Sequence, residues 1–216
     1  MSTYIYSSRE TFLARCWWQS IGDDTTPVVE GNAVAKERLA AIWLETGARN
    51  HRDHWNRYLQ STKDGELKKR LAPSDYVTPE HQYYELFWFG AYTQGSPRAD
   101  SQRFYEIRPA DRVWTVFPWV LDYSMPRFSG YVGIWPAAQP QGALRKESGA
   151  GLWTVEGLPA EPALGERFYN LCLIAPGGER VKRYPSEGSW FFNSRKGEAG
   201  FIAMEILSIP HQFGEI

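Results

Sequence analysis

Two histidines, His51 and His54, are spaced three residues apart, which would place both on one face of a helix with Asp53 between them. A catalytic zinc site needs a third protein ligand and an open coordination position. His81 or His211 could supply that ligand, but no spacing singles out either. Several arginines surround the pair, as is typical of a solvated helix face. A metal-dependent hydrolase using these histidines is therefore an alternative hypothesis, and we expect no cofactor.

The sequence shows no pattern typical of nucleophilic catalysis. Cys16 and Cys172 each lie in an apolar run, whereas a reactive thiolate needs polar, electropositive surroundings. The chain contains no Gly-x-Ser-x-Gly elbow and no glycine-rich phosphate loop. Carboxylate pairs for glycoside hydrolysis are set in space and not in sequence, so none is singled out. We therefore predict that the protein is not an enzyme.

Acidic residues gather in three segments that contain no Lys or Arg: 19–35, 147–166 and 197–216. Two of these segments are rich in loop residues, and tryptophans lie nearby, so they could present aromatic anchors and steering charges to a basic partner. Acidic loops also serve simply to keep a protein soluble. The predicted partner-binding residues are Asp23, Asp24, Glu30, Trp135, Glu147, Trp153, Glu156, Glu161 and Glu166.

Basic residues with interleaved aromatics gather in two other segments. Residues 49–70 hold seven Lys or Arg against three Asp or Glu, and residues 167–196 hold six against two. Stacking combined with phosphate attraction is the usual basis of single-strand binding. Ordinary exposed faces carry similar imbalances, however, and the net charge of the chain is −1. The composition therefore favours a protein partner over nucleic acid.

Length and composition indicate one domain over residues 1–216, with residues 136–151 as a candidate flexible loop rich in Pro, Gly and Ala. The 33 aromatic residues predict a bulky core. The N-terminus lacks the pattern of a signal peptide, and no stretch approaches the roughly 18 apolar residues of a membrane-spanning helix. Two cysteines in apolar runs are typical of free thiols in a reducing compartment. We expect a cytoplasmic protein that does not enter the membrane.

Helices are predicted early in the chain. Residues 33–46 have Ala35, Leu39 and Ile42 at helical spacing after Asn32, a favourable N-cap, and residues 48–72 continue in the same style. Later segments are aromatic or β-branched and predict strands, as do residues 4–19. The strands are expected at 83–92, 103–108, 113–123, 131–135, 152–156, 167–175, 179–184, 189–193 and 201–209. This distribution predicts an α+β fold with a mainly antiparallel sheet and helices concentrated in the N-terminal third, organised around residues 111–136.

The layout resembles the immunity proteins of bacterial polymorphic toxin systems, which include those that counter type VI effectors. Among these it is most similar to the immunity protein 52 family, which pairs with restriction-endonuclease-like toxins. The likeness rests on Arg9-Glu10 after a short first strand, the predicted helix around Leu39 and Trp43, Trp55, and the LFWFGAY run at Leu86–Tyr92.

The resemblance implies a stoichiometric inhibitor that binds a cognate toxin, expected to be a nuclease. A nuclease cleft carries Lys and Arg to hold phosphate, so acidic loops could bind it and could raise the rate of encounter by electrostatic attraction. A domain that binds carbohydrate or another small molecule through exposed tryptophans is the other alternative hypothesis.

Overall fold

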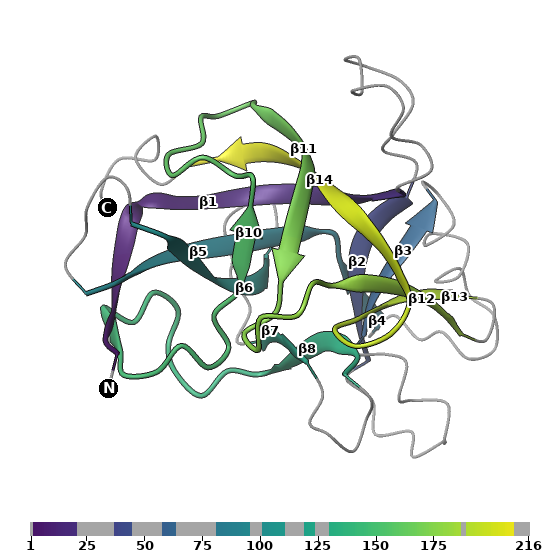
Figure 1. Cartoon of the computed structure of the whole chain (residues 1–216), viewed down its shortest axis with the longest axis horizontal. Helices are drawn as coiled ribbons and strands as arrows, with labels where there is room; N and C mark the ends of the chain where they lie inside the picture. The colour runs from purple at the N-terminus through teal and green to yellow at the C-terminus, as the bar shows by residue number, and fades with distance from the viewer. Residues whose placement is uncertain are drawn as a thin grey trace.

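The computed structural model describes residues 2–20, 37–44, 58–63, 81–95, 101–110, 119–123, 130–186 and 189–209 (Figure 1). These residues form strands joined by turns and irregular segments, and none of them is helical. The strands are β1 (Tyr4–Ser20), β2 (Glu37–Leu44), β3 (Leu59–Lys63), β4 (His81–Tyr84), β5 (Leu86–Gln94), β6 (Arg103–Ala110), β7 (Trp119–Tyr123), β8 (Val132–Pro136), β9 (Arg145–Lys146), β10 (Thr154–Glu156), β11 (Arg167–Ile174), β12 (Lys182–Ser186), β13 (Ser189–Asn193) and β14 (Glu198–Ser208).

The hydrogen-bonded strands form two closed rings, and both rings contain the β1–β14 pair. The first ring runs β1-β2-β3-β13-β12-β14 and is antiparallel throughout. The second runs β1-β5-β6-β10-β11-β14. It is closed between β6 and β10 by Tyr105 and Trp153, whose backbone N–H groups donate to each other's carbonyls at 2.7 and 2.8 Å. The architecture is therefore an all-β barrel.

The long strand β1 belongs to both rings because its two halves have different neighbours. Its N-terminal part pairs with β5 and β9, and its C-terminal part pairs with β14 and β2 (Figure 1). Phe12, Ala14, Cys16 and Trp18 alternate along it and are all buried, which confirms the inward face expected from their spacing. Pairing is irregular between Ser7 and Phe12 and again at Leu13, where β-bulges let the strand turn from one neighbour to the next.

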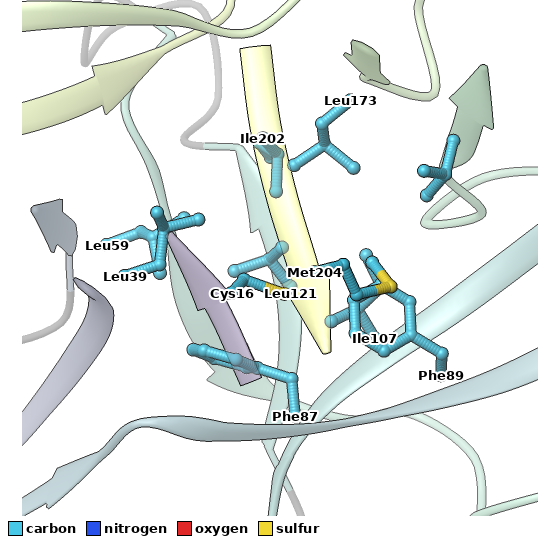
Figure 2. A pocket seen from close by; sticks show the side chains of 11 residues that line it. Cys16, Leu39, Leu59, Phe87, Phe89, Ile107, Leu121, Leu173, Ile202 and Met204 are labelled. Carbon is cyan, nitrogen blue, oxygen red and sulfur yellow. The ribbon is translucent and has the colours of Figure 1, made fainter. Parts of the chain in front are cut away.

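The two rings share one apolar core, which receives side chains from all six strands of the second ring and also from β2 and β3 of the first. A cavity of about 20 Å³ remains among them (Figure 2). Because its lining is apolar apart from the Cys16 thiol, a water there would lack hydrogen-bond partners, so the cavity is a packing gap. It is lined by Cys16, Leu39, Leu59, Phe87, Phe89, Ile107, Leu121, Val155, Leu173, Ile202 and Met204.

The predicted α+β class is wrong. The helix expected over residues 33–46 is strand β2 where it is described, and within residues 48–72 the described part contains β3. Tertiary pairing decides the outcome: β2 lies between β1 and β3 and also pairs with β4, so its backbone hydrogen bonds go to neighbouring strands. The remainder of both helical predictions lies outside the described residues.

The centre of the fold also differs from the expectation. Residues 111–136 contribute β7 and β8, which form a separate two-stranded sheet. Leu121 of β7 reaches the core from that sheet, while β1 makes the pairings around which the two rings close. The other expected strands from β5 onward are confirmed where they are described, with boundaries shifted by a few residues, and residues 113–118 of the strand expected at 113–123 lie outside the described residues. The turn at Ala175–Gly178 links β11 to β12 as a hairpin, with Ala175 N donating to Glu179 O at 2.9 Å.

Residues 137–151, within the candidate flexible loop, are irregular apart from the short strand β9 and are fastened to the outer side of β5 and β6. The Lys146 ammonium contacts Glu106, and Arg108 donates to Gln139 O at 2.7 Å. The Tyr92 hydroxyl donates to Ala143 O at 3.1 Å. These contacts hold the segment at several points along its length. In the part of the chain that the structure describes, no helix has the length and hydropathy needed to cross a membrane.

Candidate protein-binding surface

Residues 156–166, which are the last residue of β10 and the loop from β10 to β11, carry three of the predicted acidic residues and are called the acidic loop below. Its main chain is bound to the last part of β14: Gly165 N donates to Ile206 O at 2.8 Å, and Ile206 N donates to Glu166 O at 2.9 Å. Leu158 packs against the hydrophobic core, and Pro162 is buried. The loop is therefore ordered by contacts near its beginning, its middle and its end.

An apolar side chain lies on the crest of this loop between carboxylates. Leu164 is 46% exposed, and it is one of two large hydrophobic residues that the described ranges leave open to solvent. Glu156, Glu161 and Glu166 are exposed as well. One oxygen of Glu166 accepts a hydrogen bond from Ala163 N at 2.7 Å, which tightens the turn that carries Leu164. The loop thus displays a leucine on a fixed support with negative charge around it.

The charge of the acidic loop is not cancelled by nearby cations. Arg167, the first residue of β11, bonds to Glu205 at 3.0 Å, and this hydrogen bond raises the pKa of its guanidinium. Within the described ranges, Glu156, Glu161 and Glu166 take part in no ion pair. A basic partner surface would therefore meet carboxylates that have no cation to displace.

Glu147 lies apart from the acidic loop. It follows β9, which pairs with Tyr4 and Ile5 at the start of β1, whereas Glu166 binds the strand that pairs with Ala14. Its carboxylate and the Arg145 guanidinium are 2.9 Å apart, and both side chains are 64% exposed. The structure does not gather Glu147 with the other three glutamates. Asp23, Asp24 and Glu30 lie outside the described residues.

The two tryptophans predicted as anchors differ in their surroundings. Trp153 is fully buried, and its indole N–H donates to Leu121 O at 2.8 Å, so it belongs to the core and cannot touch a partner. Trp135 is half-buried, with its ring 6.1 Å from that of Tyr58. The burial of Trp153 could have been predicted from the sequence, because strand alternation places Trp153 on the same face as Val155 and opposite Glu156.

Three comparisons were made, with protein-family models, curated proteins and solved structures. None finds a match.

The groups behind the alternative hypotheses are placed only in part. None of the described tryptophans is among the exposed large hydrophobic residues, which are Leu144 and Leu164. The described residues contain no cluster of three or more His, Cys, Asp or Glu that could hold a metal ion. His51 and His54 lie outside the described residues.

Leu164 was not among the predicted partner-binding residues. The signal available for it is its position in an acid-only segment between Pro162 and Gly165, where a strand that would bury it cannot continue. A leucine in such a turn is a candidate for exposure, and an apolar side chain encircled by charged groups has the arrangement of an interface with an apolar centre and a polar rim.

Proposed function

We propose that this protein acts without catalysis, as a stoichiometric inhibitor that binds another protein through the acidic loop. The observation that supports this most directly is Leu164, held exposed between Glu161 and Glu166 on a loop whose main chain is bonded to β14. A loop whose main chain is already fixed loses little backbone freedom when a partner covers it, so burial of its side chains contributes more fully to affinity.

The class of partner follows from the charge. Carboxylates without internal cations favour a basic surface, and they raise the rate of encounter with it more than the final affinity. A nuclease toxin, whose cleft carries Lys and Arg for phosphate, is a partner of this kind, and we propose the role of an immunity protein on that basis together with the likeness to that class. Because the early helices that entered the likeness are strands where described, the proposal rests on the loop more than on the layout.

The test uses the product of the neighbouring reading frame as the candidate toxin, expressed with this protein in the same cells. We expect the parent to protect the cells, Leu164→Ser to weaken the complex by roughly 10-fold or more through faster dissociation, and Glu156→Lys with Glu161→Lys to slow association in a salt-dependent way. Survival and binding kinetics are the measurements.

Glu179→Lys is the matched control, because Glu179 is an exposed glutamate in the hairpin that follows β11, outside the acidic loop. It should protect as well as the parent. Full protection and unchanged kinetics for all loop variants would show that the acidic loop is not the contact. Failure of the parent to bind or protect would reject the inhibitor role itself.

A further inference from the structure

A second charged surface, opposite in sign to the acidic loop, lies where β13 turns into β14. Lys182, Arg195 and Lys196 meet there beside the rings of Tyr131 and Tyr184, and these five residues are called the cationic face. Tyr131 comes from the segment before β8, and its backbone bridges Asn193 at the end of β13. Tyr131 therefore lies beside the β12–β13 hairpin and the turn that follows it, although it is far from them in the sequence.

The cations of this face are held by neutral groups. The Lys196 ammonium lies over the ring of Tyr184, 4.1 Å from its centroid, and 5.5 Å from that of Tyr131. The Lys182 ammonium donates to the carbonyl of Arg195 at 3.3 Å. In the described part of the chain, Lys182, Arg195 and Lys196 form no ion pair. Ring faces and carbonyls orient a cation without cancelling its charge, so the full positive charge is kept.

The turn that presents these cations is rigid. The buried Asn193 side chain accepts hydrogen bonds from Arg195 N at 2.8 Å and Lys196 N at 3.0 Å. Ser194 N donates to Gly130 O at 2.9 Å. Gly197 has a φ of +120°, and a Cβ there would lie 2.3 Å from the carbonyl oxygen of Arg183, so only glycine fits. The backbone that carries Arg195 and Lys196 is therefore fixed.

A fixed group of cations without carboxylate partners is an anion receptor, and the neighbouring rings indicate which anion. Tyr131 and Tyr184 are half-buried beside the cations; the ring of Tyr131 also packs 5.2 Å from that of the buried Tyr58, and the half-buried Trp135 lies 6.1 Å from Tyr58. Phosphates along a nucleic-acid strand would meet the cations, and unstacked bases would meet the rings. An acidic peptide would use the cations alone. We propose that the cationic face binds the phosphate backbone of single-stranded nucleic acid.

This activity is separate from toxin inhibition and involves no residue of the acidic loop. The slightly negative formal charge of the whole chain does not oppose it, because at physiological salt the Debye length is about 8 Å and a distant carboxylate contributes little. The charge that the strand would meet is the local one.

The experiment measures fluorescence anisotropy of labelled oligo-dT and oligo-rU, about 10 nucleotides long, titrated with the purified full chain without a partner. We expect binding at low salt that weakens as salt rises, with a logarithmic slope of about −0.7 for each phosphate neutralised. Arg195→Gln and Lys196→Gln should each lower the affinity several-fold and flatten the slope by about 0.7.

Two further variants separate charge from folding. Lys196→Arg keeps both the charge and the contact with the rings, so it should bind like the parent. Arg145→Gln changes the net charge of the chain equally, but at an exposed arginine paired with Glu147 on another surface, and it should also bind like the parent. Circular dichroism of each variant shows that it is folded.

Three outcomes would overturn the proposal. The first is no binding of either oligonucleotide at low salt. The second is a loss for Arg145→Gln as large as that for Arg195→Gln, which would show only a general charge effect. The third is competition by polyglutamate that equals competition by unlabelled oligonucleotide, which would identify an acidic protein segment as the ligand. Because the assay contains no toxin, none of these results bears on the proposed inhibitor role.

Discussion

Glu106 is almost completely buried in an ion cluster on the outer side of β6. Its carboxylate contacts both Arg108 and Lys146, and Arg108 and Glu106 are 3% and 2% exposed. Two cations share this single carboxylate, and one of them belongs to the segment that runs from β8 to β10. The residue therefore connects a barrel strand with the irregular chain that lies over it.

Replacing Glu106 with Gln should lower the free energy of unfolding by about 3–5 kcal/mol, because it leaves two cations in a buried site without their carboxylate. Glu147→Gln is the matched control, since its ion pair with Arg145 is 64% exposed on both sides and should contribute less than about 1 kcal/mol. Urea denaturation measures both. Equal losses for the two variants would show that burial does not set the strength of the Glu106 cluster.

Asp122 of β7 gives the protein a pH dependence of known sign. Burial raises the pKa of its carboxyl, and the hydrogen bond from Tyr123 N to Oδ1, at 2.8 Å, opposes part of that rise. The folded state therefore holds this proton more tightly than the unfolded chain does, where the pKa is about 3.9. The contribution of the Asp122 carboxyl to the stability of the fold therefore falls as the pH rises from about 3.9 through the pKa of the folded state.

Asp122→Asn should accordingly be more stable than the parent at about pH 7 and equal to it at about pH 3, where the carboxyl is protonated in both states. Thermal unfolding at the two pH values measures the difference. Glu161→Gln, on the exposed acidic loop, should have the same stability as the parent at both pH values. A parent that gains stability from pH 3 to pH 7 relative to Asp122→Asn would reverse the sign and contradict the assignment.

At the scale of elements, β11 changes register at a bulge between Phe168 and Leu171. Asn170 sits there with a φ of +57°, and its side chain and backbone both bond to the amide of the buried Gln19, at 2.8 and 3.1 Å. Asparagine suits the position because it tolerates the left-handed conformation and offers an acceptor. The bulge is thereby fastened to β1 across the intervening strand.

Asn170→Gly keeps the backbone conformation and loses the side-chain bond, so it should cost about 1 kcal/mol. Asn170→Ala loses the bond and also strains the backbone, so it should cost about 2–3 kcal/mol. Denaturant titration should show the parent as the most stable, the glycine variant as less stable and the alanine variant as the least stable. If the glycine variant is less stable than the alanine variant, left-handed strain is not what selects asparagine here.

Elements also show how far the sequence could be interpreted. Alternating or aromatic runs such as those of β1, β5 and β6 were predicted as strands, since their local pattern and their pairing agree. In β2 the local pattern and the strand pairing conflict. Leu39 and Ala41 are two residues apart and both face the core, as in a strand, but the alanines in this segment favour a helix. The exposed Leu164 and the cationic face depend on backbone turns and distant pairings that no local pattern specifies.

The whole molecule is two rings that share β1 and β14, which couples their stability. Disrupting either shared strand opens both rings at once, so we expect one cooperative unfolding transition. Tryptophan fluorescence and far-ultraviolet circular dichroism should give coincident denaturation curves. Separate midpoints for the two probes would show that one ring survives without the other.

The fully buried Ile206 of β14 tests the coupling. Ile206→Ala should cost about 2–5 kcal/mol and shift both curves together. Ile174→Ala, in β11 of the second ring alone and half-buried, should cost less. A change in the fluorescence curve without a change in the dichroism curve for Ile206→Ala would contradict a shared closure.

The position of β14 also has a consequence for biosynthesis. It is the last described strand, and it pairs with β1, which leaves the ribosome before every other described strand. Neither ring can close until residues 198–208 have been made, and at about 5–20 residues per second the unpaired edge of β1 stays open for roughly 10–40 s. A nascent polypeptide with such an open edge is prone to join its neighbours on a polysome. Slower elongation or scarce chaperones should therefore reduce the soluble yield of this protein more than that of a chain whose strands pair in order of synthesis.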